Sequence, residues 1–357
     1  LYPEKFNNKT NGIVPRRWTQ IAAPELSSAI DQFIGDDWRS HIHSLGGLET
    51  YLDDQQALET FYQVKKDAKE RLANYIKETT GFQVSTDAIF DVQVKRLHAY
   101  KRQLLNVLHI IKLYLDLKDN PDKDMVPRVF IFGAKAAPGY HFAKSVIKII
   151  NELASLINND EGLEGKLHVF FLENYNVSLA ELIIPAADVS EQISLASKEA
   201  SGTSNMKFMM TGAITLATLD GANIEIKDEV GDDNIVIFGM DKDAVYNHYR
   251  LNDYHSRDLY DNDPLIHRVI DSFVNGTIPN IQSEGMEIYE ALIQHNDEYF
   301  LLEDFHSYIE AQEKIDRLYR NKAEWAQITL KNIAKSHKFT ADDTIVQYAK
   351  EIWELKK

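Results

Sequence analysis

Short apolar runs alternate with longer helical patterns through the middle of this 357-residue chain. Each run is apolar almost throughout and rich in β-branched or aromatic residues, which is typical of a strand buried on both faces of a sheet. The runs are RVFIFG (128–133), KLHVFFLEN (166–174), AITLATLDG (213–221) and NIVIFG (234–239). The sequence therefore predicts four strands separated by helices.

One helical pattern, over 101–119, precedes these runs, and another, over 142–157, falls between the first two. The first is expected to be amphipathic, with one apolar face formed by Leu104, Leu108, Ile111 and Leu115. Strands that alternate with helices predict an α/β fold, a Rossmann-like, doubly wound parallel sheet with helices on both faces. Ligands of such sheets bind beyond the carboxyl ends of the strands. We therefore expect the chemistry in the loops that follow the first three predicted strands.

The two ends of the chain also have helical patterns, over about 20–85 and from about residue 240 onward. The last stretch, TADDTIVQYAKEIWELKK, begins with Thr340 and Asp343 at the spacing of a capping box. Its apolar residues are expected to pack inward: Ile345, Tyr348, Ile352 and Trp353.

Composition narrows the possible functions. The net charge is −16 at pH 7, which disfavours binding to nucleic acid phosphates and anionic lipid. The lack of cysteine excludes disulfides, cysteine nucleophiles and thiolate metal sites, and the 12 histidines are scattered without ligand spacing, so no metal site is expected. No apolar run is long enough to span a bilayer. We expect a cytoplasmic protein with neither nucleic acid nor membrane as a partner.

A cluster of basic residues stands out against this acidic background. The stretch VQVKRLHAYKRQ (92–103) contains Lys95, Arg96, Lys101 and Arg102 and no acid. Arginine binds oxyanions as a fork and lysine as a point charge, so the stretch could hold one or two phosphate groups. The alternative is a solvated helix start with a cationic stripe.

A turn of small residues precedes an apolar helix in EASGTSNMKFMM (199–210). Such a turn presents free backbone N–H groups at a positive helix end, which suits an anion, while Glu199 could hold hydroxyl groups. The alternative is an ordinary N-cap.

Lys207 lies inside this helix with Met206, Phe208, Met209 and Met210 around it. A lysine in apolar surroundings has a lowered pKa and is a better nucleophile, as a Schiff base to an aldehyde requires. A lysine whose stem lies along apolar surface and whose amine reaches water explains the pattern equally well.

Six blocks of the chain, in this order, resemble the α-glucan phosphorylases, the glycogen, starch and maltodextrin phosphorylase family. They are NKTNGIVPRRW, FDVQVKRLHAYKRQLLN, GAKAAPGYH, FLENYNVSLAELIIPAADVSEQIS, EASGTSNMKFMMTGA and LDGANIEI. The resemblance covers essentially the whole chain. It implies the C-terminal half of a two-domain GT-B enzyme whose active site lies between the domains. Residues 1–20 would be a crossover segment from an N-terminal domain absent from this sequence, and 21–357 the C-terminal, pyridoxal-phosphate-binding domain with its C-terminal helices.

The resemblance also implies roles for individual residues. Lys207 matches the lysine that forms a Schiff base with pyridoxal 5′-phosphate, and the further cofactor-binding residues would be Lys95, Thr203, Ser204 and Tyr175. Arg96 and Lys101 match residues that hold substrate phosphate and would act in catalysis with Lys207. Glucosyl hydroxyls would be bound by Asn11, Tyr100, Glu199, Ser201 and Gly202. This chain departs from the usual pattern at Ser204, where glycine is common, and at Asn176, where many members have arginine.

The implied activity is phosphorolysis of terminal α-1,4-glucosyl units by inorganic phosphate, giving α-D-glucose 1-phosphate with retention of configuration. The cofactor's 5′-phosphate would relay the proton. We expect a homodimer when full length and an inactive chain when alone. Three alternatives stay open: a GT-B glycosyltransferase that uses a nucleotide-sugar, a non-catalytic phosphate- or sugar-binding domain, and a conventional pyridoxal-phosphate transaminase.

Overall fold

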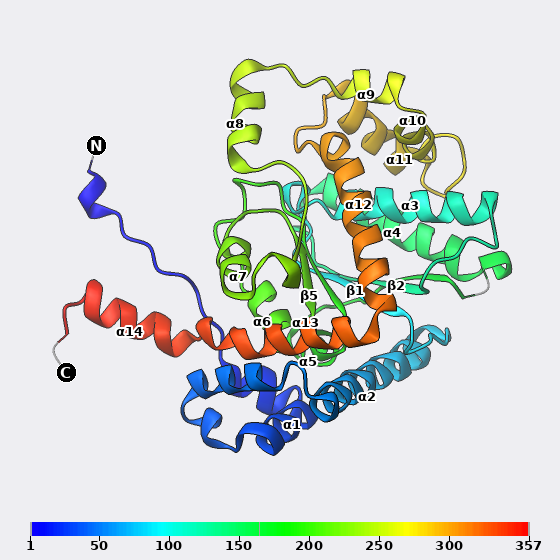
Figure 1. Ribbon diagram of the computed structural model, residues 1–357. Coiled ribbons are helices and arrows are strands. Elements are labelled where there is room, and N and C mark those ends of the chain that lie inside the picture. The colour runs from blue at the N-terminus through cyan, green and yellow to red at the C-terminus, as the bar shows by residue number, and fades with distance from the viewer. Residues whose placement is uncertain (1, 164, 356–357) are drawn as a thin grey trace.

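The computed structural model describes residues 2–163 and 165–355. Within them the core is a six-stranded sheet in the order β3-β2-β1-β4-β5-β6, and all neighbouring strands are parallel (Figure 1). This confirms the predicted α/β fold with a doubly wound parallel sheet. The strands are β1 (Ile89–Val94), β2 (Arg128–Gly133), β3 (Leu167–Phe171), β4 (Val189–Gln192), β5 (Ile214–Ala217) and β6 (Val236–Ile237).

Helices cover both faces of the sheet (Figure 1). One layer contains α3 (Gln103–Asp119), α4 (His141–Asn158), α10 (Pro264–Asp271), α11 (Gln282–Tyr289) and α12 (Leu301–Arg320). The other contains α2 (Gln55–Thr80), α5 (Val177–Ala186), α6 (Ser204–Met210), α7 (Ala222–Val230) and α13 (Lys322–Lys335). The remaining helices are α1 (Pro24–Ile34), α8 (Lys242–Leu251), α9 (Ser256–Asn262) and α14 (Ala341–Glu351). No helix in the described ranges is long and apolar enough to cross a membrane.

The sequence pattern missed β1 and β4, the two central strands. Both have buried polar side chains where an apolar run was expected: Asp91, Gln93, Ser190, Glu191 and Gln192. These side chains are accommodated because distant residues bond to them, among them Arg128 of β2, 3.2 Å from Asp91, and Gln312 of α12, 2.7 Å from Glu191. A rule based on apolar runs cannot find strands of this kind.

The amphipathic pattern expected for α3 is wrong. Nearly its whole circumference is buried from Gln103 to Ile111, whereas Leu115 is only partly buried. The reason is position, since α3 packs against the sheet and also contacts α4, α10 and α12.

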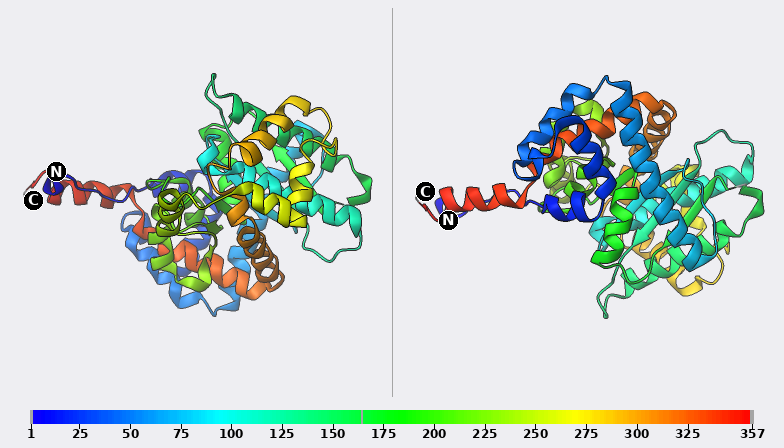
Figure 2. Two further views of the ribbon diagram at one scale, coloured as in Figure 1. Left: turned by 90° about the horizontal axis from the view of Figure 1, so that it is seen from above. Right: turned by 90° about the horizontal axis from the view of Figure 1, so that it is seen from below.

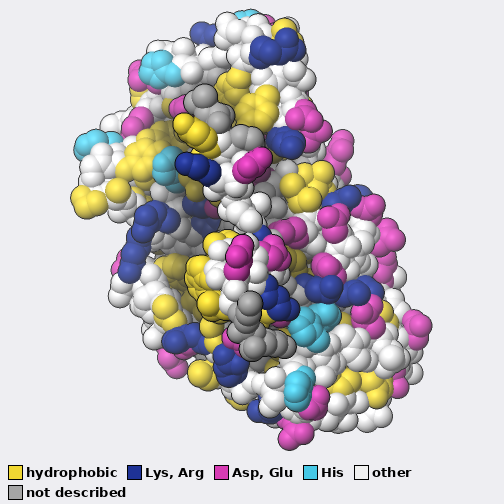
Figure 3. All heavy atoms as spheres, turned by 90° about the vertical axis from the view of Figure 1, so that its left-hand side faces the viewer, with side chains coloured by type: hydrophobic (Ala, Val, Ile, Leu, Met, Phe, Trp, Pro, Cys, Tyr) yellow, Lys and Arg dark blue, Asp and Glu magenta, His cyan; other side chains and the backbone are white. Residues whose placement is uncertain are grey.

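The prediction that the last helix packs inward is also wrong. Thr340 does cap α14, because its side chain accepts a hydrogen bond from the N–H of Asp343, but no residue of α14 is buried. The helix and the extended segment 2–12 run outward together as an arm (Figures 1 and 2). Trp353 is 53% exposed and Ile345 is 55% exposed. Figure 3 views the side from which the arm projects, and apolar side chains gather there in patches.

Segment 13–18 returns to the body and fixes the base of this arm. Ile13 forms a parallel bridge with Thr340, and a Cβ on Gly12 would lie 2.2 Å from the Thr340 carbonyl carbon. Only glycine permits this close approach. Trp18 is buried in the apolar core beside α2 and α6.

Candidate active site at the centre of the sheet

The loops after β1 and β4 meet where the strand order reverses. This switch point is where doubly wound sheets bind ligands, and its two strands are the ones that the apolar pattern missed. The loop after β1 contains the basic cluster, and the loop after β4 leads into the small-residue turn. A hydrogen bond of 2.9 Å from the N–H of Leu195 to the carbonyl of Tyr100 ties the two loops together.

Lys95, Lys101 and Glu199 form the charged centre of the site, called here the switch-point cluster. Lys101 Nζ lies 2.5 Å from Glu199 Oε2, and Lys95 Nζ lies 3.9 Å from the same oxygen. Burial lowers the pKa of Lys95 to about 8, which Glu199 only partly offsets. Burial would raise the pKa of Glu199, but the two lysines outweigh it and the pKa is lowered. Two ammonium groups therefore share one carboxylate at the carboxyl ends of the central strands.

The other two basic residues of the stretch 92–103, Arg96 and Arg102, lie in different environments. Arg96 is exposed beside the site. Arg102 is fully buried: its Nη1 lies 2.6 Å from Asp304 Oδ2 and its Nε donates to the Ile193 carbonyl at 2.8 Å. The idea that all four charges could face a phosphate is therefore wrong for Arg102, which holds the loop after β4 against α12.

Asp220, after β5, positions the small-residue turn. Its Oδ2 accepts hydrogen bonds from the N–H groups of Glu199 at 2.7 Å and Lys198 at 3.1 Å. Gly221 then passes so close that a Cβ there would lie 2.7 Å from the Ser201 carbonyl oxygen. Gly202 has φ +80°, a left-handed conformation that favours glycine. No local pattern in the sequence marks Asp220 for this role, because the N–H groups that it holds lie 21 and 22 positions away.

The start of α6 has no side-chain cap from Thr203 in the described part of the chain. Thr203 occupies the N-cap, but its side chain makes no capping bond, so the ordinary N-cap interpretation is wrong. The Ser204 hydroxyl lies 3.3 Å from Gln192 Nε2 at the end of β4. The methionines and Phe208 of this helix face the apolar core, not the lysine amine.

Lys207 extends from α6 toward segment 13–18. Its Nζ lies 4.5 Å from the centroid of the Trp18 ring and has no hydrogen-bond or ion-pair partner among the described residues. Burial, and then the charge of Arg17, lower its pKa. Lys207 is thus a half-buried amine held over an aromatic face. No local pattern in the sequence links Trp18 to Lys207, 189 positions away.

Tyr175, after β3, borders the same edge of the sheet. Its ring packs on Gly133 at the end of β2, where a Cβ would lie 3.1 Å from the ring, and burial raises its pKa to about 12. Asn176 caps α5 by accepting a hydrogen bond from the N–H of Leu179 at 3.1 Å.

Tyr100 and Asn11 lie at the border of the site. The Tyr100 ring lies 4.7 Å from Lys101 Nζ. Asn11 is exposed on the arm, and its neighbour Thr10 bonds Glu225 of α7. The structure thus gathers Lys95, Lys101 and Glu199 directly, whereas Asn11 makes no contact with them.

No group of three or more potential ligand side chains that could hold a metal ion occurs in the described ranges. Several histidines bond other side chains instead, such as His43, whose Nδ1 lies 3.1 Å from His337 Nδ1.

Comparison with known proteins identifies the relatives of this chain. The family model described as carbohydrate phosphorylase matches residues 1–355. The chain is 51% identical over 356 residues to a glycogen phosphorylase of Bacillus subtilis, covering 100% of this chain and 45% of that protein. It is 48% identical over 356 residues to a glycogen phosphorylase of Pasteurella multocida, covering 43% of it. It is 44% identical over 356 residues to the human muscle form, covering 42% of it. The chain spans less than half the length of these relatives.

Proposed function

Because the chain belongs to the carbohydrate phosphorylase family, we propose that it supplies the phosphate-binding part of an α-1,4-glucan phosphorylase. The complete protein would transfer a terminal glucosyl unit to inorganic phosphate and release α-D-glucose 1-phosphate. The observation that carries this proposal is the switch-point cluster, in which two lysines face one carboxylate in an acidic protein. Such a cluster can exchange its carboxylate for a phosphate.

In this proposal the basic residues divide the work between two phosphates. Lys95, the more buried, would pair with a cofactor phosphate, together with the backbone N–H groups at Thr203 and Ser204. Lys101 and Arg96 would hold the substrate phosphate. The ammonium group of Lys101 would become available for it once Glu199 binds another partner. Cancelling positive charge is required if two phosphates are to lie close together.

Pyridoxal 5′-phosphate fits the residues present. Lys207 offers an amine of lowered pKa without a partner among the described residues, and the Trp18 face below it gives an apolar support for a ring. Tyr175 would line the slot, and the family cofactor would supply a phosphate that exchanges a proton with substrate phosphate. The role of this chain is to hold that phosphate beside Lys95 and to keep water from the amine.

Sugar recognition would fall to the small-residue turn. Glu199 would accept hydrogen bonds from glucosyl hydroxyls, and the N–H groups of Ser201 and Gly202 would donate to them, with Tyr100 and Asn11 at the border. Asp220 holds the turn in place. Because Glu199 contacts lysines here, sugar binding would require it to leave Lys101, which couples the two substrates.

The test is covalent capture at Lys207 in the complete protein. Borohydride, which makes a lysine-bound aldehyde cofactor permanent, should leave a pyridoxyl-phosphate mass on the Lys207 peptide. Lys207→Ala should abolish both this mass and phosphate-dependent release of glucose 1-phosphate. The matched control is Lys198→Ala, because Lys198 is an exposed lysine of the same site.

The result also separates the alternatives. Activity that depends on a nucleotide-sugar, without the adduct, would favour the other GT-B transferases. Normal phosphorolysis by Lys207→Ala would contradict the assignment. A transaminase is disfavoured because Lys207 has no acidic partner set around it among the described residues.

The partner of this chain would be the N-terminal domain of the same protein. Residues 1–20 would form the crossover segment and 21–357 the C-terminal domain, which we expect to be inactive alone. The arm fits this role, since Phe6 is 84% exposed and Trp353 is 53% exposed. Burying such side chains against a second domain is favourable.

Trp353→Ser should loosen that contact and increase proteolysis within the arm of the complete protein, whereas Tyr246→Ser on α8 should not. Equal proteolysis of both variants would contradict this docking. The homodimer is a further expectation, to be checked by the mass of the complete protein in solution.

A further inference from the structure

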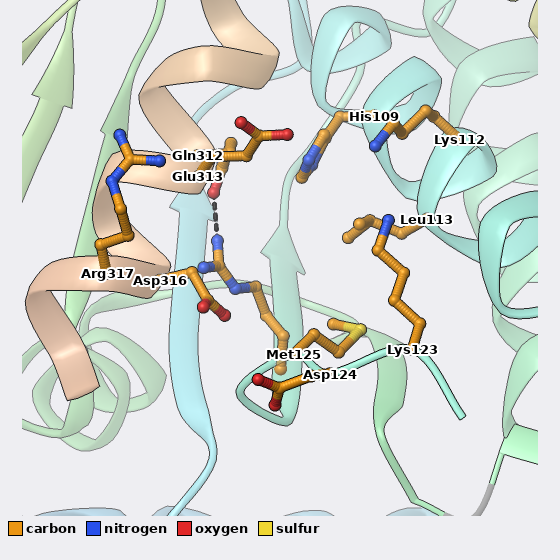
Figure 4. Close-up of a pocket in the computed structure, with 11 residues that line it drawn as sticks. His109, Lys112, Leu113, Lys123, Asp124, Met125, Gln312, Glu313, Asp316 and Arg317 are labelled. Carbon is orange, nitrogen blue, oxygen red and sulfur yellow. Dashed lines mark hydrogen bonds between the residues drawn. The ribbon is translucent and has the colours of Figure 1, made fainter. Parts of the chain in front are cut away.

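A cavity lies at the amino ends of the strands, the opposite end of the sheet from the switch-point cluster. It has a volume of about 250 Å³ and is lined by α3, α12 and the segment that leads into β2 (Figure 4). Arg128, the first residue of β2, forms part of its wall. The strand rises by about 3.3 Å per residue, so the six residues of β2 separate the cavity from the ligand-binding edge by roughly 17 Å. The cavity is therefore distinct from the site proposed above.

Two polar side chains with unused hydrogen-bonding capacity, Arg128 and His109, line this space. The Arg128 side chain is 4% exposed, and its Nη1 contacts Asp91 at 3.2 Å and hydrogen-bonds Gln312. Its Nε and Nη2 have no hydrogen-bond partner in the described part of the chain. His109 is 3% exposed, and its Nδ1 is buried without a partner in the same ranges. Buried polar groups are normally hydrogen-bonded, so the unpartnered Nδ1 of His109 is unusual, and the open Nε and Nη2 of Arg128 are left for a ligand or water in the cavity.

Basic side chains outnumber acidic ones in the lining by four to three: Lys112, Lys123, Arg128 and Arg317 against Asp124, Glu313 and Asp316. Burial and then Arg128 hold the pKa of His109 well below its ordinary value, so its ring is neutral, with one donor and one acceptor nitrogen. Two of the lining carboxylates, Asp124 and Asp316, are engaged by Arg320, which lies outside the lining. Arg317, which faces the cavity, has no ion pair in the described ranges.

The remaining wall supplies both charge and apolar surface. Lys112 and Lys123 converge on Asp116, which fixes their ammonium groups at one side of the cavity. Leu113 and Met125 lie on the same side and below (Figure 4). The volume falls just under the 300–1,000 Å³ of drug-sized ligand sites, so the occupant must be small.

We propose that this cavity binds a small organic molecule that bears one phosphate or carboxylate group. The anionic group lies against Arg128 and His109, and the uncharged body lies against Leu113 and Met125. Arginine's fork suits both kinds of oxyanion. The proposal does not depend on the proposed enzymatic function, because none of these residues belongs to the switch-point cluster.

The test uses methionine methyl NMR on the complete protein. This chain has only 6 methionines, so ¹³C-methyl labelling gives it few signals, and substitution of Met125 by leucine assigns the cavity signal. Met206, Met209 and Met210 lie on α6, in the apolar core on the other face of the sheet, so their signals should not shift and serve as references. Methyl phosphate and propionate serve as probes. We expect at least one of them to produce a saturable shift of the Met125 signal.

Variants make the test specific. Leu113→Trp fills the cavity and should abolish the Met125 shift, and Arg317→Gln should weaken binding at least fivefold. Lys314→Gln, a lysine of the same helix outside the lining, should bind as before. A response to methyl phosphate alone assigns a phosphate ester, and a response to propionate alone assigns a carboxylate. The proposal fails if neither probe shifts Met125, or if Leu113→Trp and Arg317→Gln both leave the shift unchanged.

Discussion

Lys95 and Lys69 are both buried lysines, yet their partners differ. Lys69 Nζ lies 2.6 Å from Asp188 Oδ2, 2.6 Å from the Ala88 carbonyl and 3.2 Å from the Tyr319 hydroxyl, so three acceptors meet its three donors. Among the described residues, the one ion-pair partner of Lys95 is Glu199, at 3.9 Å. The first lysine has no capacity left for a ligand, whereas the second has most of its capacity unused.

The same contrast extends to their surroundings. Lys69 and Asp188 are each 2% exposed and join α2 to the loop between α5 and β4. Nearby Lys65 bonds the carbonyls of Pro185, Ala187 and Thr211 at 2.7–2.9 Å. Glu199, in contrast, lies on a turn that backbone N–H groups and Asp220 hold. A buried cation therefore indicates a ligand site only when its partners are few and replaceable.

The largest expected effect concerns Lys69, the lysine whose three donors all have acceptors. Lys69→Met leaves Asp188 buried without its cation, which should cost about 3–5 kcal/mol in the free energy of unfolding. Urea unfolding measures it. The control is Lys66→Met on the same helix, whose amine is partly exposed and pairs with Asp87 at 3.4 Å, and which should unfold like the unmodified protein. A loss no larger for Lys69→Met than for Lys66→Met would break the comparison.

The sequence predicted the strands on either side of the sheet better than the two central strands. Apolar runs located β2, β3, β5 and β6, because strands surrounded by apolar layers carry their own signal. The central strands β1 and β4 are buried too, but Asp91 and Glu191 are accommodated by Arg128 and Gln312 from distant segments. Burial of this kind depends on the fold and leaves no local pattern.

The candidate site shows the same division. The basic stretch and the small-residue turn stood out by composition, and the family resemblance assigned their roles. The pairing of Lys101 with Glu199, 98 positions away, could not be predicted from a local pattern. The same holds for Arg102, which pairs with Asp304 and therefore does not face the site. For α14, the pattern identified an apolar face but could not say that the body of this chain leaves it uncovered.

A second prediction concerns the pH dependence of ligand binding at Lys95, the lysine with unused hydrogen-bonding capacity. Lys95 is protonated below its pKa of about 8 and loses its charge above it. The pKa of Lys101 is raised despite burial, because its ammonium group donates a hydrogen bond to Glu199. Binding of a phosphate ester that needs charged Lys95 should therefore weaken up to tenfold per pH unit above about 8. Calorimetric titration with pyridoxal phosphate from pH 6.5 to 9.5 measures this. Lys95→Met should bind weakly with little change above pH 8, and a wild-type profile equally flat there would show that Lys95 does not set the affinity.

The smallest expected effect sharpens the claim that Glu199 is replaceable. Glu199→Gln removes a carboxylate that competes with phosphate for Lys95 and Lys101. The free energy of unfolding should fall by less than in Lys69→Met, because these two amines are less completely buried than that of Lys69. Affinity for inorganic phosphate should rise a few-fold, because both ammonium groups lose their internal counter-charge while the amide can still accept a hydrogen bond. Glu173→Gln, an exposed acid after β3, should change neither quantity. A large loss of stability in Glu199→Gln, or weaker phosphate binding, would mean that the carboxylate is a fixed structural partner, and the distinction between Lys95 and Lys69 would then disappear.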